Sequence, residues 1–262
     1  MLDYYIVDAF TDTIFHGGQA GVVFLDKWTE DAMMQNIAGE FNVADTAFLI
    51  AREDGYDLRW FMPNGEISLN GHATLGAAYV IFHILKKDGE EIVFHTPSGI
   101  LTAKRKEDMI ELDFPEVLVH PYPLRQDMID ALGGSIPKEC YMGENLLFVY
   151  ADEEEIKKVH PDFEKMKQLS EGQGCFITAQ GMYTDIVGRT FWPKMGVNED
   201  PVCGNMHCNL TPFWTKRLHK NVLTSHQLSP RGASLEVESV GNRVKLRGKV
   251  ALSMKGSMNI EF

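Results

Sequence analysis

Two glycine-containing segments carry the residues best suited to chemistry. Residues 69–75 read LNGHATL, with His72 after Gly71, and residues 200–205 read DPVCGN, with Asp200 ahead of Gly204. Each glycine falls where a strand pattern gives way to a helix pattern, and the free N–H groups at a helix start favour anions. Two such starts facing each other could hold a carboxylate and stabilise the enolate-like charge beside it. Relief of crowding at two strand-to-helix corners is the structural alternative.

Asp45 is the candidate general acid or base. It stands at the entrance to an apolar strand, residues 46–50, and a carboxylate against apolar residues tends to have a raised pKa. An exposed turn aspartate that caps its own backbone would give the same local pattern. His72 sits at a helix start, where the helix dipole lowers the pKa of an imidazole and keeps it neutral.

Cys203 is the one cysteine placed for chemistry. It directly precedes Gly204 near a helix start, which predicts a lowered thiol pKa. A zinc site from Cys203, His207 and Cys208 would have poor spacing and lacks an obvious fourth ligand, so we predict no metal site. The other cysteines and His207 are expected to pack in the core. Four cysteines without CxxC spacing fit a reducing cytoplasm.

The elements that must position these residues occur twice. Residues 59–63 (RWFMP) precede the first glycine turn and residues 189–193 (RTFWP) the second, and further upstream residues 46–50 resemble 174–178. We interpret this as an internal duplication that brings two glycine turns to a shared cleft. Residues 73–85 are apolar on nearly every face, which predicts a helix buried all round.

The predicted fold is α+β, with two pseudo-symmetric lobes. Each lobe is a mostly antiparallel, barrel-like sheet wrapped around a central buried helix. In the second lobe Pro212 falls inside that helix and should kink it or shift its start. The prolines between residues 115 and 123 indicate an inter-lobe link. We therefore expect lobes at 1–117 and 118–262, with a last strand that either closes the second lobe or crosses back to the first.

Composition excludes several classes of partner. The formal net charge is −12 and no long Lys/Arg run occurs, which argues against nucleic acid. The longest apolar run, residues 73–85, is too short to span a bilayer, so we expect no membrane partner. The start of the sequence, MLDYY, lacks a basic region and passes directly into a strand pattern, which indicates no signal peptide.

Five motifs carry a family resemblance: DAFTD at 8–12, ADTAF at 44–48, NGHATLGAA at 70–78, NEDPVCGN at 198–205 and SPRG at 229–232. Over essentially the whole chain the sequence resembles the PhzF family of phenazine-biosynthesis-like isomerases. The resemblance implies a diaminopimelate epimerase-like fold, a site between the lobes, a homodimer, a role in a biosynthetic process and no cofactor. It also implies an isomerase that moves a proton on a small carboxylated metabolite with one acidic residue.

Residue by residue, the resemblance puts the general acid/base at Asp45, a supporting histidine at His72 and a second carboxylate at Asp200. It puts substrate-binding positions at Ala44, Gly71, Cys203, Gly204 and Asn205. The chain has Ala44-Asp45 where the family has Ser-Glu, and Gly204-Asn205 where the family has Gly-Ser. Shortening Glu to Asp withdraws the carboxylate by roughly 1 Å, which can cost on the order of a hundredfold in rate.

Three functional hypotheses follow. Epimerases of this fold use two thiols; Cys203 occupies the second thiol position, but the first holds Asn70, which cannot act as a base, so a two-thiol racemase is excluded. The preferred hypothesis is an isomerase with Asp45 as its single acid/base. The alternative is a catalytically weakened protein of the same fold that binds a small anion. A hydrolase with Cys203 as nucleophile ranks third, because no His/Asp relay is visible beside it.

Overall fold

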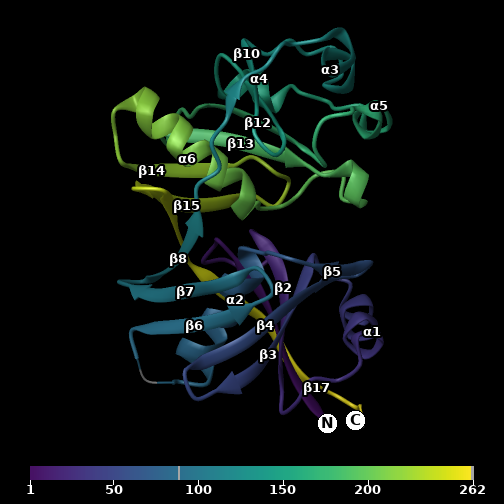
Figure 1. Cartoon of the computed structure of the whole chain (residues 1–262), viewed down its shortest axis with the longest axis vertical. Coiled ribbons are helices and arrows are strands. Elements are labelled where there is room, and N and C mark those ends of the chain that lie inside the picture. The colour runs from purple at the N-terminus through teal and green to yellow at the C-terminus, as the bar shows by residue number, and fades with distance from the viewer. Residues whose placement is uncertain (88, 261–262) are drawn as a thin grey trace. The chain divides into compact units, whose positions relative to one another are not determined.

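The computed structural model describes residues 1–87 and 89–260, and the chain forms two compact units (Figure 1). Unit 1 comprises residues 1–114 and 245–262, and unit 2 comprises residues 115–244. The sequence places one boundary between 117 and 118, whereas the structure places boundaries after Phe114 and after Val244. The C-terminal segment therefore returns to unit 1.

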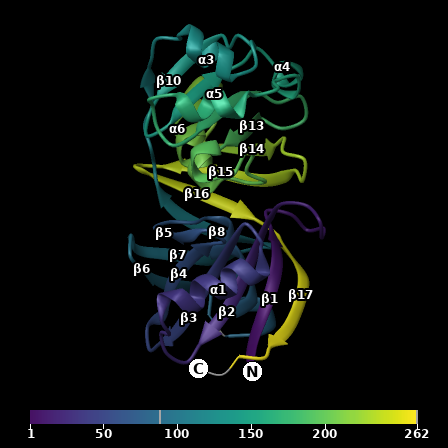
Figure 2. The same cartoon turned by 90° about the vertical axis from the view of Figure 1, so that its right-hand side faces the viewer.

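Unit 1 is a mixed sheet with two helical segments. Its strands follow the spatial order β17-β1-β2-β3-β4-β6-β7-β8-β16, and β5 extends the edge beside β4. The bounds are β1 Leu2–Ala9, β2 Gly18–Leu25, β3 Asp45–Arg52, β4 Gly55–Met62, β5 Gly65–Ile67, β6 Glu91–Thr96, β7 Gly99–Lys106, β8 Met109–Pro115, β16 Arg243–Gly248 and β17 Val250–Met258. Figure 2 shows β1 and β17 side by side, and their antiparallel register joins Leu2 to Met258.

The central helix of unit 1 is buried as the sequence predicts. Helix α2 spans His72–Tyr79 and continues as a π-helix over Val80–Ile84. It packs against β1, β2, β3 and β17, while α1 (Asp31–Phe41) packs against β3 and β4 (Figure 1). Gly76 permits the close approach to β1, because a Cβ there would lie 2.6 Å from Cγ2 of Val7. The apolar sequence of α2 therefore reflects enclosure by strands on several sides.

Unit 2 contains a second mixed sheet, ordered β9-β10-β11-β12-β13-β14-β15. The strands are β9 His120–Pro121, β10 Glu139–Met142, β11 Leu146–Val149, β12 Cys175–Gln180, β13 Ile186–Phe191, β14 Val222–Gln227 and β15 Ala233–Val240. The helices are α3 Gln126–Ala131, α4 Glu153–Lys157, α5 Phe163–Gln168, a 3-10 turn at Pro193–Met195 and α6 Gly204–Leu218. Helix α6 packs against β14 and β15.

The strand pairings confirm the internal duplication. In unit 1, β1/β2 are antiparallel, β2/β3 parallel, β3/β4 antiparallel, β4/β6 parallel and β6/β7 antiparallel. The strands β10 to β15 of unit 2 repeat this alternation in the same order. In each unit the glycine turn comes after the fourth strand of this pattern, β4 or β13, and leads into the buried helix, α2 or α6.

The register of these strands corrects the sequence match between residues 46–50 and 174–178. Arg59 lies opposite Phe48, and Arg189 lies opposite Ile177, so these two apolar residues are counterparts. The sequence comparison of 46–50 with 174–178 is therefore one residue out. Thr46 corresponds to Cys175, and Asp45 corresponds to Gly174. A one-residue slip leaves two short apolar runs equally alike in sequence, but it reverses which face each side chain occupies.

Pro212 does not shift the start of α6, so that part of the prediction is wrong. The helix begins at Gly204 and includes the proline. Because proline has no N–H, the carbonyl of Cys208 loses its normal intrahelical donor. The N–H of Val117 donates to that carbonyl instead, at 3.1 Å. A donor from outside the helix thus satisfies the group that the proline leaves open.

Across residues 1–87 and 89–260, no helix combines the length and the apolar character that a bilayer span requires.

Candidate active site

Asp45 is buried at the first position of β3. Helix α1 ends at Phe41, its C-cap Asn42 turns the chain with a left-handed φ of 49°, and Ala44 follows as a half-buried residue. The parallel register of β2 and β3 sets Asp45 beside Ala20. Asp45 is only 5% exposed, which excludes the exposed turn aspartate that the local sequence also allowed. A buried carboxylate needs partners, since an isolated one is costly to take from water.

Asn70 is the first of these partners. Its Nδ2 donates to Asp45 Oδ2 at 2.8 Å, and its Oδ1 accepts from the N–H of Ala73 at 2.7 Å. A backbone N–H can only donate, so the amide orientation is decided and the NH₂ group must face Asp45. The backbone is held as well, because Thr74 Oγ1 donates to the Asn70 carbonyl at 2.6 Å. Sequence reasoning considered Asn70 only as a missing thiol and overlooked this role.

His72 is the second partner of Asp45. It is the first residue of α2, is 4% exposed, and its Nε2 lies 2.9 Å from Asp45 Oδ2. Asn70 and His72 therefore both approach the same carboxylate oxygen. The other oxygen, Oδ1, is buried and has no hydrogen-bond partner among the described residues. The group can thus accept or deliver a proton at Oδ1 while Oδ2 is held.

The second glycine turn is fixed by a glutamine that the sequence did not reveal. Gln227, at the end of β14, donates from Nε2 to the carbonyl of Asp200 at 2.7 Å, and its Oε1 accepts from the N–H of Cys203 at 2.9 Å. Asp200 Oδ1 accepts from the N–H of Val202 at 3.1 Å. Ser229, in the SPRG motif, donates to the carbonyl of Pro201 at 2.7 Å. The SPRG motif was a usable signal, whereas Gln227 lies in no motif.

Cys203 does not have the lowered thiol pKa that its position predicts. Burial raises the pKa of this thiol well above its ordinary value, and the nearby Asp200 carboxylate adds to the increase. Its Sγ accepts from the N–H of Met206 at 3.3 Å and caps α6. The dipole argument fails here because desolvation of the thiolate outweighs the partial charge of the helix start. A protonated, buried thiol is unsuited to act as a nucleophile.

The helix starts themselves match the prediction. Gly71 precedes α2, and its carbonyl accepts the N–H of Leu75 at 2.9 Å. Gly204 is the first residue of α6, followed by Asn205, whose carbonyl accepts from Asn209 Nδ2 at 2.9 Å. The structure thus brings the unit 1 candidates together around Asp45 and the unit 2 candidates together around the second turn. That both turns face one cleft stays a prediction.

His207 is a packing residue, as expected. Its Nδ1 lies 2.8 Å from the Cys203 carbonyl and its Nε2 lies 2.9 Å from Ser225 Oγ. Complete burial lowers the pKa of His207 to about 4. Among residues 1–87 and 89–260, no three His, Cys, Asp or Glu side chains are grouped to hold a metal ion.

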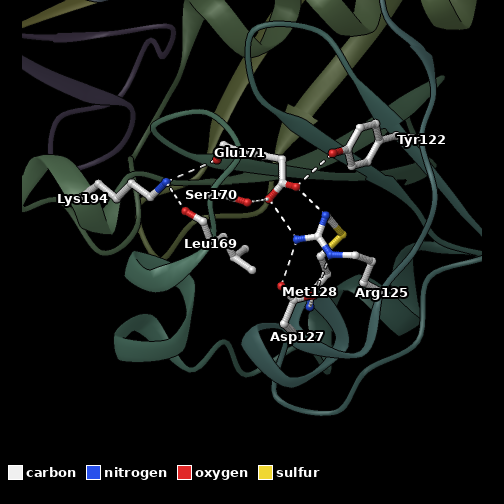
Figure 3. Close-up of polar contacts among 8 residues, drawn as sticks. All are labelled: Tyr122, Arg125, Asp127, Met128, Leu169, Ser170, Glu171 and Lys194. Atoms are coloured by element: carbon white, nitrogen blue, oxygen red, sulfur yellow. Dashed lines mark hydrogen bonds and ion pairs between the residues drawn. The ribbon is translucent and has the colours of Figure 1, made fainter.

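Unit 2 has no carboxylate at the position that corresponds to Asp45. Its counterpart Gly174 instead donates its N–H to Asn145 Oδ1 at 3.1 Å. The preceding segment is pinned by the network in Figure 3: Glu171 accepts from Arg125 and from the Tyr122 hydroxyl, the latter at 2.9 Å. In the same segment Lys194 Nζ donates to the carbonyl of Leu169 at 2.5 Å. The duplication therefore supplies one acid/base candidate of this kind, in unit 1.

An arginine–glutamate pair holds the segment ahead of each glycine turn. Arg59 on β4 binds Glu66 through two hydrogen bonds of 2.7 Å. Arg189 on β13 binds Glu199 in the same way, at 2.7 and 3.0 Å. Both glutamates stand the same distance in sequence before their glycine. We call these the two Arg–Glu pairs.

Comparison with known proteins places this geometry in a family. A family profile described as "Phenazine biosynthesis-like protein", PhzC-PhzF, matches residues 7–256. The chain belongs to the PhzC-PhzF family. An uncharacterized isomerase of Pseudomonas aeruginosa is 38% identical over 261 residues, which cover 99% of each chain. The human phenazine biosynthesis-like domain-containing protein is 33% identical over 284 residues, covering 98% of this chain and 99% of the relative.

Solved structures agree with this assignment. The crystal structure of a PhzF family protein from Enterococcus faecalis is 44% identical, with a TM-score of 0.96 and coverage of 99% of both chains. A predicted epimerase from Pseudomonas aeruginosa, at 18% identity and a TM-score of 0.74, shares the fold, with all of both chains covered. The epimerase-like α+β fold is thereby confirmed. The names of the curated relatives assign the chain to a class of isomerases and identify no substrate.

Proposed function

We propose that the protein is a cofactor-independent isomerase that moves a proton on a small carboxylated metabolite, with Asp45 as its single acid/base. The observation that carries the proposal is the state of the Asp45 carboxylate. Its Oδ2 is held by Asn70 at 2.8 Å and lies 2.9 Å from His72, while its buried Oδ1 has no hydrogen-bond partner among the described residues. One oxygen is positioned and the other is available for a proton.

The proposed step balances without a redox partner. The Asp45 carboxylate removes a proton from a carbon activated by the substrate's carbonyl or carboxyl group, which gives a neutral carboxylic acid and an enolate-like anion. The acid then gives a proton to another carbon of the conjugated system. Carboxylic acid protons exchange with solvent, so this proton can carry deuterium when the reaction runs in D₂O. Enolate-like charge is best stabilised by preorganised donors, and the starts of α2 and α6 supply backbone N–H groups of that kind.

The other site residues receive supporting roles in this proposal. His72 and Asp200 orient the substrate or stabilise its charge. The backbones at Gly71, Gly204 and Asn205 hold the anion, and the side chains of Ala44 and Cys203 contact the substrate. The neutral, buried thiol of Cys203 fits binding better than chemistry.

A catalytically weakened anion-binding protein is the second candidate. It is favoured by the short side chain at position 45 and by the alanine at position 44, where the family has glutamate and serine. A carboxylate withdrawn by roughly 1 Å can lose on the order of a hundredfold in rate while the backbone anion site is unaffected. The same protein would then retain its ligand and lose turnover.

Solvent deuterium incorporation into a panel of small amino and hydroxy acids separates the two candidates. We expect the wild type to add mass to one compound and Asp45→Asn to add none. Asp54→Asn is the matched control, because Asp54 lies on the exposed turn between β3 and β4. Absence of exchange throughout, with a carboxylate still binding in a thermal-shift assay, would reject the isomerase and favour the binding protein.

We also propose a homodimer located in the cytoplasm. Light scattering of the purified protein tests the first part, where a mass of one chain, 29.6 kDa, would reject the dimer. Microscopy of the tagged protein in its native host tests the second.

A further inference from the structure

The duplication allows Asn70 to be compared with the residue at the equivalent position of unit 2. In the equivalence that pairs Gly71 with Gly204, the residue before each glycine is Asn70 in unit 1 and Cys203 in unit 2. Each side chain accepts the N–H three residues further on: Asn70 Oδ1 from Ala73 at 2.7 Å, and Cys203 Sγ from Met206 at 3.3 Å. Both residues therefore do the same local work, which is to cap the first turn of a buried helix.

The two capping side chains differ in whether they carry a second polar group. A cysteine has no second polar group, whereas Asn70 carries an NH₂ group that must point away from the helix once Oδ1 faces Ala73. That NH₂ group donates to Asp45 Oδ2 at 2.8 Å. In unit 2 the strand position that corresponds to Asp45 is Gly174, which has no carboxylate. A cap with a donor occurs in the unit that contains the carboxylate.

Capping alone does not require asparagine here, since the cysteine of unit 2 suffices. The added donor acts on Asp45 instead. Free rotation about the terminal bond of an aspartate would exchange its two oxygens, because sp²-ended torsions are broad. A donor tied to the rigid start of α2 removes this exchange at Oδ2 and leaves Oδ1 as the oxygen that can meet a substrate proton.

We propose that Asn70 is a positioning residue, which ties Asp45 Oδ2 to the start of α2 so that Oδ1 transfers the proton. This inference rests on the proposed function of Asp45. The Asn70 amide contacts Oδ2 and not the oxygen assigned to proton transfer, so it acts through the carboxylate.

The test compares two substitutions that both remove the donor to Asp45 but differ in whether they keep the helix cap. Asn70→Cys removes the donor and keeps a cap that this fold already uses in unit 2. Asn70→Ala removes both the donor and the cap. The assay is deuterium exchange on the compound of the panel that gains mass with the wild type. We expect both variants to lose about 10- to 100-fold in kcat with KM nearly unchanged, because the carboxylate is misaligned while the anion site remains. Both variants lose the hydrogen bond to the buried Asp45 carboxylate, so both should lower Tm, and Asn70→Ala should lower it more because it also loses the cap.

Asp162→Ala is the control for capping. Asp162 caps α5 by accepting the N–H of Lys165 at 3.1 Å, and it is not one of the proposed site residues. It should lower Tm as Asn70→Ala does and leave kcat unchanged. If Asn70→Cys retains wild-type kcat, or if Asp162→Ala loses as much kcat as the Asn70 variants do, Asn70 is a structural cap and the proposal is overturned.

Crystal structures of the wild type and Asn70→Cys keep this inference separable from the proposed function. We expect the Asp45 carboxylate to rotate or shift when its donor is removed. An unmoved carboxylate would overturn the positioning role even if the wild type catalyses exchange. A shifted carboxylate in a protein that shows no exchange at all would retain the positioning role and reject the isomerase.

Discussion

The two Arg–Glu pairs allow a stability prediction with a control in the same chain. Glu199→Gln should destabilise the protein much more than Glu66→Gln does. The side chains of Arg189 and Glu199 are 13% and 15% exposed, whereas those of Arg59 and Glu66 are 21% and 34% exposed. The Arg189–Glu199 pair is therefore less screened by water, and loss of its carboxylate leaves a more deeply buried guanidinium.

The remaining partners sharpen the difference. After Glu66 is neutralised, Arg59 Nη1 still lies 2.9 Å from Asp31, a second carboxylate. After Glu199 is neutralised, Arg189 keeps the carbonyls of Ile156 and Val159, at 3.1 and 2.8 Å, which accept hydrogen bonds but carry no net charge. We expect a loss of about 2–4 kcal/mol for Glu199→Gln, since a partly buried charge loses its partner. Glu66→Gln should cost about 0.5–1 kcal/mol, the usual value for an exposed pair.

Urea denaturation of the two variants beside the wild type measures these losses. The transition should be followed by two probes, fluorescence and circular dichroism, because two compact units need not unfold together. Equal losses of free energy in the two variants would refute the reasoning, since burial and the second carboxylate would then have no effect. A larger loss for Glu66→Gln would refute it more strongly.

Two further predictions concern buried titratable groups of unit 2. Cys203 should react with iodoacetamide at pH 8 far more slowly in the native protein than in urea, because burial raises the pKa of its thiol. Mass spectrometry measures the labelling, and rapid labelling of the native protein would contradict this prediction. The pKa of His207, lowered to about 4 by burial, makes the unfolded state bind more protons, so stability should fall as pH decreases from about 6.5 to 4. The contribution is ~3 kcal/mol at most, and a His207→Gln variant should show a smaller loss of urea midpoint over that range.

Much of the fold was predictable because it depends on local pattern. The buried helix after Gly71 follows from an apolar run with no polar face, and the start of α6 follows from its glycine turn. The duplication was visible in matched segments around each turn. The register was not predictable, because two apolar runs look alike after a slip of one residue. Only the hydrogen bonding of each run to its neighbouring strand shows that Asp45 and Gly174 occupy equivalent positions.

The candidate site was predictable in its members and less so in its contacts. Asp45 and His72 stand out by type and position, but the amide that joins Asp45 to the helix comes from 25 residues away in the chain. Gln227 reaches the second turn from a distant strand and lies in no motif. The predicted direction of the Cys203 pKa shift was wrong, because the helix dipole can be inferred from the local sequence. The burial that outweighs the dipole is a tertiary property.

The asymmetry between the units has a stereochemical consequence. Both units retain a capped helix start, yet the start of β3 carries a carboxylate and the start of β12 follows a glycine. If Asp45 is the single acid/base, each proton leaves and arrives on one face of the substrate. Deuterium should then enter with a single configuration, which NMR of the labelled product can determine. Label in both configurations would require a second base and would reject the one-carboxylate mechanism.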